Sequence, residues 1–180
     1  MDIQKLNSII EALIFCSTSP IKLNKIKEIV KADRKKILSA IEQLNSEYKQ
    51  TERSFQIRQI AGGYQFYALG DFSPYLKELR KTKPIVLSSP ALETLAMIAY
   101  RQPITRIEIE NIRGVDSKGV LRNLLEKNMI KPLGKKDVIG KPILYGTTEF
   151  FLKHFGLNSI SELPKIDELA AKHSKATKEE

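Results

Sequence analysis

Apolar residues recur at every third or fourth position along the first fifty residues of the chain, a spacing that places them on one face of an α-helix. The pattern predicts a first helix that ends near Ser17, a second helix over residues 23–30, and a third helix that Asp33 caps. The three apolar faces contain Ile3, Leu6, Ile9, Ile10, Leu13 and Ile14, then Leu23, Ile26, Ile29 and Val30, and finally Ile37, Leu38, Ile41, Leu44 and Tyr48.

Strict alternation of apolar and polar residues follows in FQIRQI and YQFYAL, which are separated by the turn-forming segment AGG. Alternation with a period of two is typical of strands with one buried face, so residues 55–60 and 64–69 are predicted to pair as a hairpin. Three helices followed by a hairpin is the order of a winged-helix domain.

The second half of the chain repeats this order after the proline-containing segment KTKP. Ser89 can cap a helix that has Pro90 at its first position and that stops before Pro103. A short helix is predicted over about residues 105–112, a third helix begins after Asp116, and strands are expected at 130–133 and 143–147. The residues expected to point inward are Leu92, Leu95, Ala96 and Ile98 in the first helix, and Val120, Leu121, Leu124 and Leu125 in the third.

The predicted fold is therefore mainly α with small β-hairpins, an α+β chain built from two tandem winged-helix domains. We place the N-terminal domain at residues 1–82 and the C-terminal domain at 86–165. Residues 166–180 form a polar tail rich in lysine and glutamate, which we expect to be flexible.

Composition narrows the class of protein. The hydrophobic fraction of 42% and charged fraction of 28% are ordinary for a soluble protein, and no apolar run reaches the roughly 18 residues of a membrane-spanning helix. One cysteine and two distant histidines exclude an internal disulfide and a cysteine–histidine zinc site. We expect a cytoplasmic protein with no metal and no cofactor.

The segment LGKKDVIGKPILYGTT resembles a nucleotide-binding loop because lysines lie between two glycines. Five residues separate Gly134 from Gly140, whereas a phosphate-cradling loop has four before Gly-Lys-Ser/Thr. Pro142 offers neither an amide donor nor a hydroxyl, and a strand follows where the motif requires a helix. The segment is predicted to be the wing of the second domain, and since no other catalytic motif can be assembled, we expect no enzyme activity.

The net charge of +9 invites a nucleic-acid interpretation, although the excess is spread thinly and a solvated basic surface explains it equally well. A DNA-binding transcriptional regulator is the alternative function that the two winged-helix modules allow, but neither third helix shows a side-chain pattern typical of base reading. The possible phosphate contacts are Arg34, Lys35 and Lys36 at the start of the third helix, and Lys135, Lys136 and Lys141 in the second wing.

The other use of two helical modules is as an assembly surface. Apolar residues are plentiful relative to the cores that such small domains enclose, and an antiparallel hairpin hides only one face in its own core. Some of this apolar surface can therefore be a subunit interface, while core filling is the alternative for each residue.

Three blocks in the second half resemble the bacterial segregation and condensation protein B family: ALETLAMIAYRQPITRIEIE, RGVDSKGVL and GKPILYGTT. The resemblance runs without a gap from Leu87 to Leu157, with Lys141 where the family pattern leads us to expect arginine. The first half resembles the family in architecture more than in motif.

The resemblance implies a non-catalytic subunit of the bacterial condensin complex. Members of the family form homodimers through their N-terminal domains and bind the kleisin ScpA, which bridges the heads of the SMC ATPase. The complex condenses and segregates chromosomes, so the expected location is the nucleoid, with DNA association indirect or nonspecific and no membrane contact.

Site residues follow from the resemblance and from the shape of the corner between the first two helices of the second domain. The expected kleisin contacts are Tyr100, Arg101, Gln102, Ile104, Thr105, Arg106 and Arg113. The alternative for three of them is structural, with Thr105 capping a helix and Tyr100 and Ile104 filling the core. The expected dimer contacts are Ile10, Leu13, Ile14 and Phe66.

Overall fold

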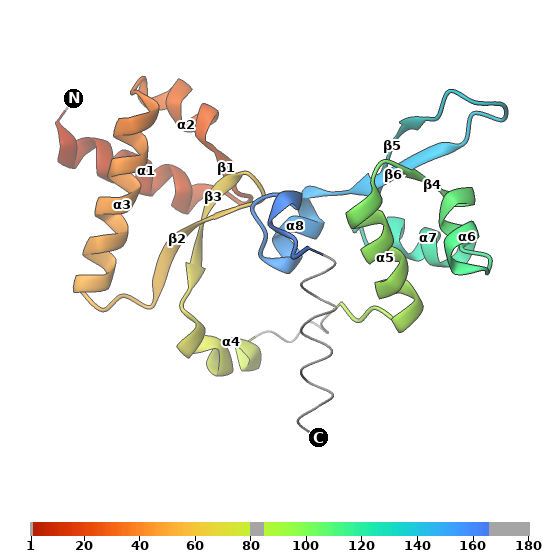
Figure 1. The fold of residues 1–180 in the computed structure, drawn as a ribbon. Coiled ribbons are helices and arrows are strands. Elements are labelled where there is room, and N and C mark those ends of the chain that lie inside the picture. Colours follow the sequence, from red (N-terminus) through yellow and green to blue (C-terminus); the bar gives the residue numbers. More distant parts are fainter. Residues whose placement is uncertain (1, 80–84, 166–180) are drawn as a thin grey trace.

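The computed structural model describes residues 2–79 and 85–165, which form two winged-helix units with separate hydrophobic cores (Figure 1). The predicted end of the first domain at residue 82 and the predicted tail at 166–180 lie outside the described residues. The two-unit, mainly α architecture with small antiparallel sheets is confirmed, while the domain boundaries stay a prediction.

The first unit has the predicted order of three helices and a hairpin, with three further short elements. Its elements are α1 (Ile3–Cys16), β1 (Ile21–Lys22), α2 (Leu23–Val30), α3 (Arg34–Gln50), β2 (Phe55–Ile60), β3 (Gly63–Ala68), the 3-10 turn η1 (Gly70–Phe72) and α4 (Ser73–Leu79). Helix α2 and strand β2 have the predicted bounds, and strand β3 begins and ends one residue earlier than predicted. Strand β1 was not predicted because two residues are too few to show an alternating pattern.

The second unit repeats the same order. Its elements are α5 (Ser89–Arg101), β4 (Ile104–Thr105), α6 (Arg106–Arg113), α7 (Lys118–Glu126), β5 (Ile130–Lys135), β6 (Ile143–Thr147), α8 (Glu149–Phe155) and the 3-10 turn η2 (Ile160–Glu162). Each unit holds a three-stranded antiparallel sheet in which the last hairpin strand is central, with strand orders β1-β3-β2 and β4-β6-β5. The N-cap residues are Ser88 for α5 and Ser117 for α7, each one position from the predicted caps Ser89 and Asp116.

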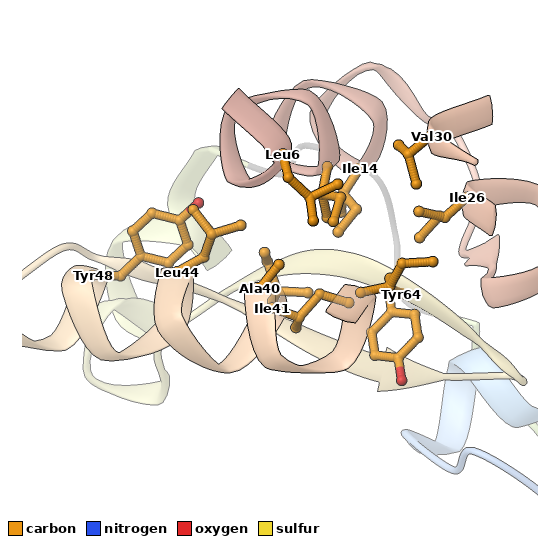
Figure 2. Packing of buried hydrophobic residues seen from close by; sticks show 12 residues of the cluster. Leu6, Ile14, Ile26, Val30, Ala40, Ile41, Leu44, Tyr48 and Tyr64 are labelled. Carbon is orange, nitrogen blue, oxygen red and sulfur yellow. The ribbon is translucent and has the colours of Figure 1, made fainter. Parts of the chain in front are cut away.

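The first core joins α1, α2 and α3 to the hairpin (Figure 2). Leu6 and Ile14 of α1 point toward Ala40, Ile41 and Leu44 of α3, with α2 and the sheet closing the remaining sides. Burying these aliphatic side chains supplies the main driving force for folding a unit of this size.

Helix α5 is rotated relative to the face that its leucines predict. Its buried residues are Ala91, Thr94, Leu95, Ile98 and Ala99, whereas Leu92 is 47% exposed. Thr94 tolerates complete burial because its hydroxyl donates to the Pro90 carbonyl over 2.8 Å. The prediction that Leu92 and Ala96 point inward is wrong, because Ala91, Thr94 and Ala99 lie beside Leu95 and Ile98 on the buried face and leave both residues at the surface.

The two units touch through the turn of the first hairpin. The amide of Ala61 donates to the Leu157 carbonyl over 3.0 Å, and the amide of Gly62 donates to Asn158 Oδ1 over 3.0 Å. Lys22 Nζ also lies 2.7 Å from Glu149 Oε1 at the start of α8. Figure 1 shows α8 beside the first hairpin, so both amides at this turn are bound by the other unit.

We predict that Asn158→Ala speeds amide hydrogen exchange at Gly62 about fivefold, the effect of losing a hydrogen bond worth about 1 kcal/mol. The amide of Ala61 keeps its carbonyl acceptor and changes less. Exchange measured by NMR distinguishes the two amides. Asn111→Ala, an exposed change on α6, is the control, and equal exchange rates at Gly62 in the two variants would contradict the contact.

Candidate partner-binding surfaces

The corner between α5 and α6, residues 100–106, is held by a network of hydrogen bonds. Thr105 and Glu108 form a capping box at the start of α6, in which the Thr105 amide donates to Glu108 Oε2 over 2.8 Å and the Glu108 amide donates to the Thr105 hydroxyl over 3.3 Å. Gln102 Oε1 accepts from the Thr147 amide of β6 over 2.7 Å. The corner is therefore a fixed part of the fold.

This network changes the expected list of kleisin contacts. Thr105 is buried as the helix cap and Ile104 is buried in the core, so the prediction that these two side chains meet a partner is wrong and the structural alternative is confirmed. The guanidinium of Arg113 donates to the Ser117 hydroxyl over 3.1 Å and lies 4.0 Å from Glu93, with only 9% of the side chain exposed. Its role is to join α6 to α7, and it offers a partner almost no surface.

Three members of the predicted group remain accessible. Arg101 and Arg106 are exposed, and Tyr100 is half-buried with its hydroxyl donating to the Pro164 carbonyl over 2.6 Å. Arg106 lies 3.5 Å from Glu110 and lines a hollow of about 430 Å³ bounded by α6, α7 and β6. Arg101 lines a second hollow of about 520 Å³ beside Pro103 and α6. Each hollow thus contains one arginine of the predicted group, and the first hollow is also lined by Arg122.

The four predicted dimer contacts fall into two groups that differ in burial. Ile10 and Ile14 have 0% and 1% exposed surface, so their assignment to an interface is wrong because both side chains fill the unit's own core. Leu13 and Phe66 are half-buried, and each lines a hollow beside α1. These two stay available for contact.

The outward side of α1 carries a set of exposed residues that we call the α1 face: Ser8, Ala12, Phe15 and Cys16. Phe15 is 78% exposed, and its ring lies 6.3 Å from the ring of Phe66. A hollow of about 910 Å³ lies on one side of this face, toward β1 and α2, and one of about 460 Å³ lies on the other, toward the hairpin. Phe15 was not among the predicted contacts, because it falls outside the apolar face predicted for this helix.

The six predicted phosphate contacts are all exposed and fall on two separate units. Arg34, Lys35 and Lys36 open α3, while Lys135, Lys136 and Lys141 belong to the second wing. Within the described residues only Lys136 of the six forms an ion pair, with its Nζ 2.6 Å from Glu108 Oε1. This ion pair and the two hydrogen bonds from Thr105 lower the pKa of Glu108 to about 2.

Comparison with known proteins gives a consistent result. Residues 8–166 match the family model of the segregation and condensation complex subunit ScpB. Segregation and condensation protein B of Syntrophotalea carbinolica is 42% identical over 168 residues, covering 93% of this chain and 85% of the relative, and that of Clostridium tetani is 44% identical over 163 residues, covering 90% and 86%. The chain belongs to the ScpB family. A solved structure of a conserved hypothetical protein from Chlorobium tepidum is similar at 38% identity, covering 86% of this chain and 98% of that one with a TM-score of 0.42.

The sequence blocks that carry the ScpB resemblance contain residues that end helices or allow close packing in the second unit. Gly114 ends α6 with φ +70, a left-handed conformation that glycine adopts without strain. Gly146 lies where a Cβ would come within 2.7 Å of Gln102 Oε1 and 2.5 Å of Leu133 Cδ1. These glycines, like the Thr105 cap, serve the fold first and position the accessible residues through it.

Neither a metal centre nor a membrane span is found in the described chain. Residues 2–79 and 85–165 contain no group of three or more histidine, cysteine, aspartate or glutamate side chains that could hold a metal ion. Over the same residues, every helix is too short or too polar to cross a bilayer.

We predict that Gly146→Ala destabilises this ScpB-family chain by about 1 kcal/mol, because the added methyl must displace Gln102 Oε1 from its hydrogen bond with the Thr147 amide and push the Leu133 side chain aside. Urea unfolding measures the change. Gly119→Ala is the matched control, because it adds the same methyl to α7 in open space and is expected to be neutral or to stabilise by up to about 1 kcal/mol. Equal losses in both variants would contradict the close packing around Gly146.

Proposed function

We propose that this ScpB-family chain is a non-catalytic assembly subunit of a bacterial SMC complex. Two copies pair through the α1 face, and each copy binds the kleisin ScpA through the α5–α6 corner of its second unit. ATP hydrolysis belongs to the SMC partner, and the subunit acts in the cytoplasm at the nucleoid, without a cofactor. Family membership supports the role in segregation and condensation.

The observation that carries the pairing is the exposed apolar surface of α1. The core of the first unit is complete without Phe15, because α1 already contributes Leu6, Ile10 and Ile14 to it. Apolar hollows lie on both sides of the α1 face. A contiguous apolar patch of this kind is typical of protein interfaces, and a second copy that fills the hollows removes it from water.

The kleisin contact is supported by the pair of arginines at the corner. Arg101 and Arg106 face two hollows that also present Ile112 and Ile107, so an acidic segment with apolar side chains would complement both in charge and in polarity. The capping box and the Gln102 bond keep this corner in one shape, which reduces the conformational entropy lost on binding.

A sequence-reading regulator is less well supported. The outward side of the candidate recognition helix α7 presents Lys118, Arg122, Asn123 and Glu126. The guanidinium of Arg122 is engaged by Glu126 at 2.9 Å, and an arginine held in this way is not free for the bidentate guanine contact that is most common in specific readers.

We predict that Phe15→Ser raises the dimer dissociation constant on the order of thirtyfold, the loss expected for an aromatic hot spot worth about 2 kcal/mol. Light scattering over a micromolar concentration series measures the change. Tyr75→Ser on α4 is the control, because Tyr75 is 73% exposed and lies outside the α1 face. A wild-type chain that stays monomeric, or a dimer that Phe15→Ser leaves intact, would contradict the interface.

We predict that the double variant Arg101→Glu/Arg106→Glu binds purified ScpA at least about tenfold more weakly, because both charges at the corner are reversed. Isothermal titration calorimetry measures the affinity. Lys49→Glu/Lys77→Glu makes the same charge change on exposed residues of the first unit and is expected to bind normally. An unchanged affinity in the arginine variant would place the kleisin elsewhere without affecting the dimer assignment.

A further inference from the structure

The tip of the second wing carries apolar side chains with nothing in this chain to bury them. The hairpin of β5 and β6 projects from the helices of the second unit (Figure 1). Ile139 at its tip is fully exposed, and the neighbouring Val138 is about half exposed. Because the side chain of Ile139 is fully exposed, it contributes no burial energy to folding and can contact another molecule.

Lysines flank this tip on both sides. Lys135 ends β5 and Lys141 stands just before β6, and among the described residues neither forms an ion pair. Lys136, the first residue after β5, is held by Glu108 of α6, which ties the wing to the body of the unit. Asp137 is the one acidic residue in the segment 131–141.

The tip is also closed by its own backbone. The Lys136 amide donates to the Pro142 carbonyl over 2.9 Å, and the Lys141 amide donates to the Val138 carbonyl over 2.9 Å. These bonds present Ile139 between the lysines in one conformation, which limits the entropy lost when a ligand binds.

The first wing differs in both respects. Its turn amides, from Ala61 and Gly62, are bound by Leu157 and Asn158 of the second unit, and Ala61 is buried. Of the two wings, only the second has a tip free to meet another molecule.

We propose that the tip of the second wing binds double-stranded DNA in the minor groove, with Ile139 as an apolar wedge and Lys135 and Lys141 on the phosphate rows at either side. The minor groove is about 6 Å wide, too narrow for a two-stranded hairpin but open to a single side chain, and a phosphate row runs along each edge. Isoleucine is among the residues that other proteins insert between base steps from this groove. Cations on both strands of the hairpin match two phosphate rows better than the single acidic edge of a protein groove.

This DNA site is separate from the α1 face. Pro142 and Ile143 of the same wing line the Arg106 hollow of the α5–α6 corner, but Lys135, Ile139 and Lys141 do not. The DNA site does not depend on the dimer or kleisin contacts, and a failure of either leaves it unaffected. It also assigns the cationic wing a sequence-tolerant role, because the minor groove distinguishes mainly A·T from G·C pairs.

The test is fluorescence anisotropy of the full chain with 20-base-pair duplexes, one A·T-rich and one G·C-rich, between 50 and 200 mM salt. Each phosphate contact contributes about 0.9 to the slope of log affinity against log salt. Lys135→Gln/Lys141→Gln is therefore expected to reduce the slope by about 2. Ile139→Ser is expected to keep the slope, to bind about tenfold more weakly, and to lose the bending of a doubly labelled duplex measured by energy transfer.

The matched control is Lys49→Gln/Lys77→Gln, which removes two exposed charges from the first unit and is expected to keep the wild-type slope within about 0.5, less than one phosphate contact. Thermal melts and ScpA binding of the wing variants are expected to match those of the wild type. Three results would overturn the proposal: no binding by the wild type at 50 mM salt, equal loss of slope in the wing and control variants, or an Ile139→Ser variant that binds and bends DNA normally.

Discussion

Each winged-helix unit encloses a small core, and the limited apolar surface that it can bury decides what every other residue is free to do. In the first unit, Ile10 and Ile14 of α1 are wholly consumed by packing against α3 and the hairpin. The opposite side of the same helix, with Phe15 at its end, is left in water. The proposed dimer contact is therefore the exposed side of α1, and the other side of this helix is buried in the core.

In the second unit, internal hydrogen bonds likewise decide which polar side chains of the α5–α6 corner are available to a partner. Thr105 and Gln102 satisfy backbone amides that would otherwise be unpaired, and Arg113 joins α6 to the start of α7. Only the arginines that lie outside this network remain accessible. A rigid corner with two exposed arginines, of which Arg106 lies 3.5 Å from Glu110, suits the binding of a flexible partner segment, because most of the entropy cost on the protein's side is met during folding.

The two wings show how the same element takes different roles in one chain. The first wing ends in a tight turn whose amides bind the second unit, so it serves as an internal joint. The second wing is tied to α6 by the ion pair of Lys136 and Glu108 just after β5, and the side chain of Ile139 beyond this point is fully exposed. A contact between the units thus determines which wing is available outside.

The sequence by itself determined the order of the three main helices and the hairpin in each unit, the bounds of α2, and the family, because helical and strand periodicities are local and the ScpB blocks are contiguous. It did not determine which apolar residues face inward. Leu92 and Ile10 have the same spacing signal, yet one is exposed and the other buried, since burial depends on partners far away in the chain. The same holds for Thr105 and Arg113: only the tertiary structure brings Glu108, Ser117 and Glu93 to them, and these contacts turn expected binding residues into supports of the fold.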